Sequence, residues 1–154
     1  MKHTHPHNHL LIGIILMLIV TIVVGCSPTR HVPDGEYLLD HVRIETDSKD
    51  ISAGSLRSFI QQNPNYRIMG ILPLQLTIYN LSGADTTNSV NRWLRSIGDA
   101  PVLYSDEAMQ ASCYQLTKAL LNMGYMHAEV SADTLVKDKR MTVTYKVKAN
   151  EPFY

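Results

Sequence analysis

The stretch ALLNMGYMHAEV, residues Ala119 to Val130, joins two kinds of hydrophobic pattern with almost no loop between them. Before Gly124, apolar side chains recur every three or four residues, which is the spacing of one face of an α-helix. After Gly124 they alternate with other residues, which is the spacing of a β-strand. Glycine commonly follows the last residue of a helix because it adopts the left-handed backbone conformation easily. The stretch therefore predicts a helix that ends at Gly124 and a strand that starts at once, with Tyr125 at the corner.

The helix before this joint is predicted to begin at Ser105. Serine is a favoured N-cap residue, and the negative charges of Asp106 and Glu107 suit the first turn of a helix. One stripe of the helix is apolar and should face the core; it consists of Met109, Cys113, Leu116, Leu120 and Met123. On this stripe Cys113 is expected to be a core side chain, not a nucleophile.

Residues 127–148 are predicted to form a β-hairpin. In the first strand, one side carries Ala128, Val130, Ala132 and Val136. The segment KDKR, residues 137–140, turns the chain. In the returning segment MTVTYKVK, the inward side carries Met141, Val143, Tyr145 and Val147, and the residues between them are polar.

Upstream of the helix, residues 38–46 read LLDHVRIET and predict a half-buried strand. Val42 and Ile44 would face the core, and His41 would lie on the polar side as a solvated side chain. A short first helix is expected after Ser52, which can cap it, and Pro64 marks its end. Its apolar face would carry Leu56, Phe59 and Ile60.

Residues 65–100 form an insertion between these elements. Leu72, Leu74, Leu76 and Ile78 recur at period two around Pro73, so this part could be an edge strand. It could equally be one irregular helical turn and a short extended piece. The following SVNRWLRSIG predicts a helix that stops at Gly98. One face of this helix carries Val90, Trp93, Leu94 and Ile97, and Arg92 and Arg95 should be solvated on the outer face.

The predicted order is therefore strand, helix, insertion, helix, strand, strand. One face of the sheet would be covered by the helices, which gives an α+β fold with two layers. The 154 residues have room for one domain of ordinary size.

The first 25 residues read as a signal peptide. Leu10 to Gly25 is apolar but slightly shorter than the roughly 20 residues of a comfortable membrane span. It ends in VVGC, which resembles a bacterial lipobox and implies cleavage after Gly25 and a diacylglycerol on the sulfur of Cys26. The alternative is an uncleaved transmembrane anchor. If the lipobox is processed, residues 26–36 would be a lipidated tether, and Ser27, in place of aspartate, favours the outer membrane by analogy.

The composition points away from several functional classes. The formal charge is zero, whereas a nucleic-acid-binding protein needs a basic surface. His3, His5, His7 and His9 lie within the signal peptide, so no metal site is expected there. The sequence lacks the HExxH, GxSxG and CxxC motifs and a phosphate-binding loop, so we expect neither catalysis nor a cofactor.

The pattern formed by several of these residues resembles that of a known family, the polypeptide-transport-associated (POTRA) domains. The matching pattern is Leu120, Gly124-Tyr125, Ala128 and Val130, then Val143, Val147 and Glu151-Pro152. Together with the lipobox and the segments VPDGEYLLDHVRI, IYNLSG and NRWLRSIGDAPVLY, it resembles the N-terminal part of the lipoprotein BamA/TamA-like outer-membrane assembly factors of Bacteroidetes-type bacteria. Residues 37–150 would be the POTRA-like domain, and 151–154 the start of a link to a missing next domain.

The resemblance implies a periplasmic, chaperone-like docking module on the outer membrane. It would bind unfolded outer-membrane proteins or subunits of the assembly machinery by β-augmentation, in which an extended chain pairs with an open sheet edge. The edge implied here is His127, Ala128, Glu129, Val130, Ser131, Ala132 and Asp133. The alternative is a stand-alone outer-membrane lipoprotein that binds another envelope component by the same edge.

Overall fold

A computed structural model describes residues 11–17 and 27–150 of the chain. Within 27–150 the elements are β1 (Leu38–Thr46), α2 (Ala53–Leu56), a 3-10 turn η1 (Arg57–Phe59), α3 (Leu74–Leu81), α4 (Ser89–Ile97), α5 (Asp106–Asn122), β2 (Glu129–Lys137) and β3 (Arg140–Lys148). Residues 11–17, within the predicted signal peptide, form a short helix with exposed side chains. Among the helices described, none has both the length and the apolarity needed to cross a membrane.

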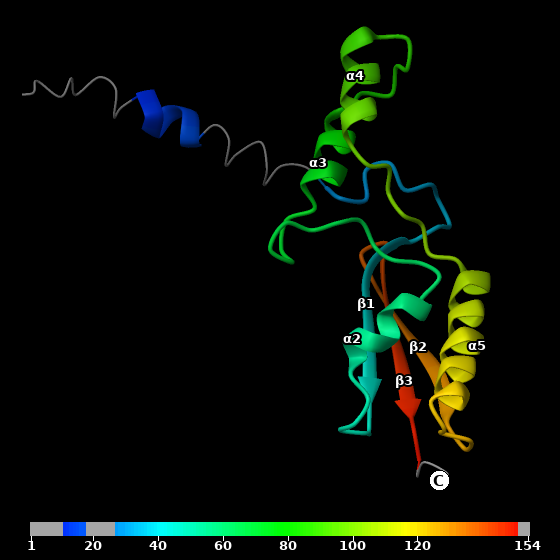
Figure 1. Cartoon of the computed structure of the whole chain (residues 1–154). Coiled ribbons are helices and arrows are strands. Elements are labelled where there is room, and N and C mark those ends of the chain that lie inside the picture. Colours follow the sequence, from blue (N-terminus) through cyan, green and yellow to red (C-terminus); the bar gives the residue numbers. More distant parts are fainter. Residues whose placement is uncertain (1–10, 18–26, 151–154) are drawn as a thin grey trace, which may run out of the picture.

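The three strands form one sheet with the order β1-β3-β2. The central strand β3 runs parallel to β1 and antiparallel to β2. Helices α2 and α5 lie against one face of this sheet, and the other face is open to solvent (Figure 1). The predicted two-layer α+β arrangement is therefore confirmed.

The main core lies between the sheet and these helices. The buried side chains of β3 face it at every second position, as the alternating pattern predicts. Leu56 of α2 and Leu116 and Leu120 of α5 are completely buried in the same cluster as these β3 side chains. The full buried cluster is Leu39, Val42, Ile51, Leu56, Ile60, Leu116, Leu120, Met141, Val143, Tyr145, Val147 and Ala149.

The ends of α5 follow the sequence prediction. The Ser105 hydroxyl accepts a hydrogen bond from the Ala108 N–H at 3.2 Å, which caps the helix. The same hydroxyl donates to Glu107, and this bond lowers the pKa of the Glu107 carboxyl. At the other end, Gly124 has a φ of +96°, so the left-handed conformation expected there is present. Met123, the last residue of the predicted stripe, is largely exposed.

The joint between α5 and β2 is slightly longer than predicted. The Tyr125 N–H donates to the Leu120 carbonyl, and the Ala128 N–H donates to the Tyr125 carbonyl. These bonds form a turn that contains His127 and Ala128, and the strand begins at Glu129. His127 and Ala128 thus lie before the edge strand, not in it.

A tight turn joins β2 to β3. Asp138 and Lys139 both have positive φ values, 51° and 59°, and Lys137 pairs with Arg140 across them. Two central residues with positive φ define a type I′ hairpin turn, whose twist matches that of the flanking strands. The predicted hairpin is therefore present.

The insertion forms a small helical hairpin that projects from one end of the sheet domain (Figure 1). Residues Leu74–Leu81 form the helix α3, so the edge strand considered for this segment is wrong. Pro73 stands at the N-cap of α3, where its missing N–H leaves no helical hydrogen bond unmade. Apolar residues at every second position are typical of a strand. In this segment they instead lie on different sides of a short helix of eight residues.

Helix α4 is present as predicted, but most of its apolar face is exposed. Arg92 is exposed, as predicted, and Leu94 is half-buried. Val90 and Trp93, which we expected to face the core, are 61% and 60% exposed, and Ile97 is also exposed. Arg95, expected in solvent, lies against α3 instead. Its guanidinium donates to the Ser82 hydroxyl and the Gly83 carbonyl and sits 5.7 Å from the centre of the Tyr79 ring.

Candidate functional site

The candidate binding site is the outer edge of β2. Strand β2 pairs with β3 along its full length of nine residues, from Glu129↔Lys148 to Lys137↔Arg140. On its other side, no strand among residues 27–150 pairs with it. An edge strand of this kind presents a row of backbone N–H and C=O groups that a further extended chain can pair with.

The hairpin geometry determines which backbone groups face outward. In a two-residue hairpin the residues that flank the turn, here Lys137 and Arg140, exchange backbone hydrogen bonds. Hydrogen-bonded and non-hydrogen-bonded pairs then alternate along an antiparallel ladder. The backbone groups directed to the open edge are therefore those of Val130, Ala132, Thr134 and Val136.

The side chains of the predicted edge residues divide between the two faces of the sheet. Val130 and Ala132 are partly buried and pack against the core, as predicted. Glu129, Ser131 and Asp133 are exposed on the solvent face. Asp133 forms an ion pair with Lys146 of β3 at 2.6 Å, and this contact raises the pKa of the lysine.

The hairpin end of β2 is more apolar at its surface than the sequence suggested. Leu135 is 69% exposed, and Val136, which we expected to face the core, is also largely exposed. The twist of the sheet carries this end of β2 away from α5 (Figure 1). The alternation pattern identifies the face on which a side chain lies, but not whether a helix covers it there.

The other edge of the sheet is partly occupied. The Leu39 N–H donates to the Val102 carbonyl at 2.8 Å, and the Tyr104 N–H donates to the Tyr37 carbonyl at 2.8 Å. The segment after the insertion thus lies along the first part of β1, with a bridge between Leu38 and Leu103. This leaves β2 as the longer free edge of the described domain.

The described residues show no arrangement that favours catalysis. No group of three or more His, Cys, Asp and Glu side chains in these parts of the chain could hold a metal ion. Cys113 packs against the core, as predicted, and burial raises the pKa of its thiol, which makes it a poor nucleophile. His41 lies beside Asp40, 3.0 Å from its carboxylate, and is partly exposed.

Several predicted sites lie outside the described residues. These are the lipidation site Cys26, the histidines of the predicted signal peptide, and the proposed link 151–154. The predicted tether is described from Ser27 onward, and residues 27–36 run beside α3 to the start of β1 (Figure 1).

Comparison with known proteins gives one match. A family model described as "POTRA: Surface antigen variable number repeat" matches residues 37–150. No match is found among curated proteins, and none among solved structures. The matched range contains the whole sheet, its covering helices and the helical insertion.

Proposed function

Because this chain belongs to the POTRA family, we propose that it is the periplasmic docking module of a BamA/TamA-like factor that assembles outer-membrane proteins. POTRA domains are protein-interaction modules without catalytic activity, and they are periplasmic parts of outer-membrane assembly factors. They typically bind clients or partner subunits during that assembly. The proposal assigns this work to β2.

The observation that carries the proposal is the open edge of β2. A strand of nine residues offers Val130, Ala132, Thr134 and Val136 as the positions whose backbone groups can pair with an incoming chain. Binding through backbone groups depends little on sequence, which suits a module that receives many unfolded outer-membrane proteins. Exposed Leu135 and Val136 add apolar contact for the alternate side chains of a β-strand.

The polar residues of the same strand should restrict which chains can pair with this edge. Glu129 and Asp133 place carboxylates on its solvent face. Charged side chains on edge strands oppose uncontrolled edge-to-edge pairing, so two copies of the domain should not aggregate through β2. A client strand with neutral or basic residues on that face would be tolerated better than an acidic one.

We further propose that Cys26 carries lipid and holds the module at the outer membrane. The sequence VVGC and the short tether before β1 support this anchor. Replacement Cys26→Ala should abolish labelling of the chain by palmitate. Persistent labelling of this variant would contradict the lipidation site without affecting the edge-binding proposal.

The edge proposal is tested by a pair of substitutions at one position. Thr134→Pro removes an outward N–H and should leave the bonds between β2 and β3 in place, whereas Thr134→Val keeps the N–H. Thr134 suits this test because its side chain is exposed, whereas Val130, on the same edge, packs against the core. The probe is a synthetic outer-membrane β-strand peptide with alternating apolar and polar residues, and its fluorescence anisotropy reports binding to the full chain in mild detergent.

We expect Thr134→Pro to weaken peptide binding about tenfold, as loss of one or two hydrogen bonds would do. Thr134→Val should bind as the wild type does, and a peptide methylated on its backbone nitrogens should not bind. Equal affinities of the two variants, with circular dichroism unchanged in both, would exclude β2 as the docking edge.

A further inference from the structure

Most of the apolar face of helix α4 has no partner in the described structure. Helices normally turn their apolar stripe to the core and their charges to water. Here Arg95 faces α3, and Trp93, Val90 and Ile97 face outward. The Asn91 side chain accepts a hydrogen bond from the Gly83 N–H and donates to the Asp85 carbonyl, which fixes this orientation further. Side-chain hydrogen bonds within the insertion therefore hold α4 with this apolar face exposed.

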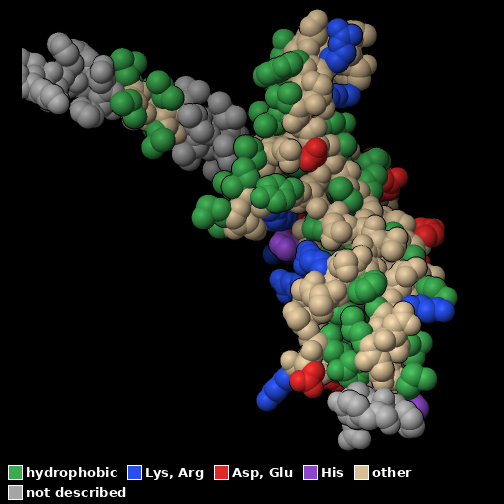
Figure 2. All heavy atoms as spheres, in the orientation of Figure 1, with side chains coloured by type: hydrophobic (Ala, Val, Ile, Leu, Met, Phe, Trp, Pro, Cys, Tyr) green, Lys and Arg blue, Asp and Glu red, His purple; other side chains and the backbone are tan. Residues whose placement is uncertain are grey.

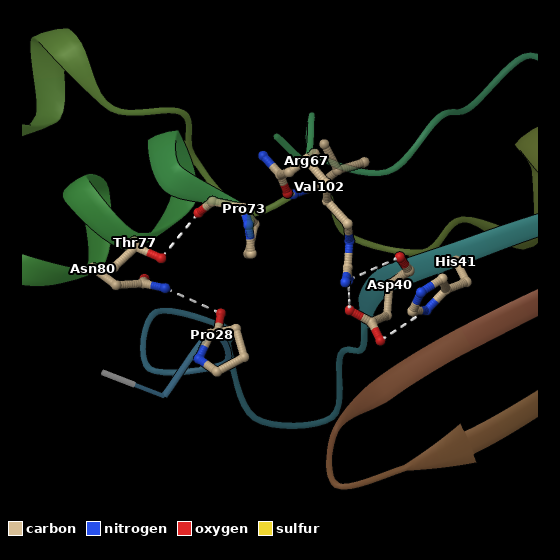
Figure 3. Close-up of polar contacts among 9 residues, drawn as sticks. Pro28, Asp40, His41, Arg67, Pro73, Thr77, Asn80 and Val102 are labelled. Carbon is tan, nitrogen blue, oxygen red and sulfur yellow. Dashed lines mark hydrogen bonds and ion pairs between the residues drawn. The ribbon is translucent and has the colours of Figure 1, made fainter. Parts of the chain in front are cut away.

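The loop before α3 adds a second apolar surface. Ile68 and Leu72 pair across a tight turn, and the Met69-Gly70 tip has left-handed φ values of 53° and 73°. Met69 is 90% exposed and Ile71 72% exposed, which is unusual for side chains of this size. The base of the loop is held by Arg67, which pairs with Asp40 of β1 (Figure 3). A firmly held loop therefore presents an apolar tip.

Both apolar surfaces lie on the insertion, one flank of which is seen in Figure 2. Hydrophobic side chains gather there from α4 past α3 to the loop before α3 (Figure 2). We call this surface the apolar flank and define it by Met69, Ile71, Leu72, Val90, Trp93 and Ile97, all exposed. Contiguous exposed apolar surface of this kind marks an interaction site with a protein or a membrane.

The start of the described chain, residues 27–31, is bound to the insertion through Asn80. Asn80 of α3 is completely buried, and its amide nitrogen donates to the Pro28 carbonyl at 3.1 Å and the Ser27 carbonyl at 3.4 Å (Figure 3). Its amide oxygen lies 3.0 Å from the His31 ring nitrogen, and the Arg30 guanidinium donates to the Asn80 carbonyl. Cys26 lies outside the described residues and precedes Ser27 directly in the sequence. Ser27, the residue after the predicted lipidation site, is thereby tied to the insertion.

We propose that the apolar flank is a membrane-docking surface, which contacts the same phospholipid leaflet that holds the acyl chains of Cys26. This inference rests on the lipid anchor proposed above, and it adds the part of the protein that meets the bilayer. The insertion would lie on the membrane surface and fix the orientation of the sheet domain. A lipid on a loose tether would leave that orientation free.

The chemistry of the flank fits a lipid surface. Residues 65–100 contain three arginines and two aspartates, so the insertion has a formal charge of +1 in a chain whose formal charge is zero. Anionic headgroups attract such a segment. Tryptophan prefers the boundary between headgroups and acyl chains, where its ring is apolar and its N–H stays hydrated, and Trp93 is exposed at this position.

Trp93 is the single tryptophan of the chain, so its fluorescence reports on the flank alone. The test uses the full lipidated chain in vesicles of phosphatidylethanolamine and phosphatidylglycerol, with and without lipids brominated on their acyl chains. We expect Trp93 emission to shift to the blue in vesicles, to be quenched severalfold by brominated lipid, and to be protected severalfold from acrylamide.

A matched control moves the indole to the sheet domain. In Trp93→Phe combined with Tyr114→Trp, the indole stands at an exposed position of α5. Brominated lipid should not quench it, because only the insertion meets the bilayer. In a second variant, Met69→Glu with Ile71→Glu, the changed side chains are exposed and the fold should persist. Quenching of Trp93 should then fall severalfold while palmitate labelling stays unchanged.

The outcomes separate this inference from the proposed function. Palmitate labelling without quenching of Trp93 would overturn the docking surface and leave the lipid anchor intact. Protection of Trp93 that depends on protein concentration and not on lipid would also overturn it, in favour of contact between copies of the chain. Peptide binding at β2 is measured independently, so its loss would not bear on the flank.

Discussion

At the scale of single residues, Gly98 shows how closely the two helices of the insertion approach. A Cβ atom at this position would lie 2.5 Å from the Tyr79 nitrogen and 2.8 Å from the Gln75 carbonyl oxygen. The Asp99 N–H also donates to that carbonyl at 3.1 Å. Gly98 therefore ends α4 for a steric reason, since its φ of −93° is one that any residue can adopt.

We expect Gly98→Ala to destabilise the packing of α4 on α3 by about 1–3 kcal/mol, because backbone atoms must move to admit the methyl group. Hydrogen exchange of the α4 amides should report this as weaker protection. Gly54→Ala is the matched control, because its Cβ would meet only the Ser52 hydroxyl at 3.4 Å, an ordinary contact. The control should be neutral or stabilising by about 0.5 kcal/mol. Unchanged protection in Gly98→Ala would contradict the close approach.

Two core residues predict how stability depends on pH. Burial raises the pKa of the Cys113 thiol. Burial also raises the pKa of the Tyr145 phenol, although its contact with Ser112 acts in the opposite direction. Both groups are neutral when protonated, so the folded state holds these protons more tightly than the unfolded state. Their contribution to the free energy of unfolding is complete below the unfolded pKa of about 8.5 for Cys113 and about 10 for Tyr145, and it is lost above.

The full chain should therefore unfold at lower urea concentration at strongly alkaline pH than at neutral pH. Cys113→Ala should reduce the part of the stability loss that begins near pH 8.5. The variant should also be somewhat less stable at every pH, because the substitution leaves a small cavity. Urea titrations monitored by circular dichroism at neutral and alkaline pH would measure both effects. A midpoint that stays constant or rises with pH would show that these groups are not desolvated.

At the scale of elements, α4 shows what an amphipathic pattern can and cannot predict. The spacing of Val90, Trp93 and Ile97 identifies a helix correctly, because the period of the pattern follows from the helix itself. The prediction for Arg92 is confirmed, since it is exposed, but the predictions for Arg95 and for Trp93 are wrong, because the side that faces the protein depends on the partner. Tyr79, Ser82 and Gly83 offer Arg95 a ring face, a hydroxyl and a carbonyl oxygen, and these contacts hold its charge against α3.

This orientation gives a sharp expectation for Trp93. Trp93→Ala should change the free energy of unfolding in solution by no more than about 0.5 kcal/mol, as for other exposed positions. Leu116→Ala, at a completely buried position of α5, should cost about 2–5 kcal/mol. A loss in Trp93→Ala as large as that in Leu116→Ala would mean that Trp93 is part of a core.

At the scale of the whole molecule, two amide side chains close the insertion at its base. Asn65, before the insertion, donates to the Ala100 carbonyl at 2.8 Å and accepts from the Val102 N–H at 2.9 Å. Gln62 donates to the Leu103 carbonyl and accepts from the Ser105 N–H. These bonds hold the two ends of the insertion together and place it at a defined position relative to the sheet.

Asn65→Ala should loosen this junction by about 1–3 kcal/mol, because a carbonyl and an N–H lose their partner. Limited proteolysis of the full chain should then cut more quickly near residues 99–103. Gln110→Ala is a suitable comparison, since Gln110 makes only an exposed contact with Asp106 within α5. Equal cleavage rates in the two variants would contradict the role given to Asn65.

The sequence predicts the sheet domain better than the insertion for a physical reason. Gly124, Ser105 and the alternating residues of β3 carry local signals that come from backbone geometry and hydrogen bonding, and the structure follows them. Segments 65–74 and 98–105 carry few such signals, and their positions depend on long-range contacts such as those of Asn65. The open edge of β2 follows from strand order, which the resemblance to the family supplied and local pattern could not.

The position of the central strand has a kinetic consequence. β3 is the last strand among residues 27–150, yet it pairs with both β1 and β2. Strand β1 must wait for a partner that lies roughly a hundred residues later in the chain, so the closure entropy of a long loop opposes its pairing. Domains dominated by such distant contacts fold slowly. The sheet of this domain therefore cannot close until β3 is available, and until then the backbone groups of β1 that pair with β3 lack their partner.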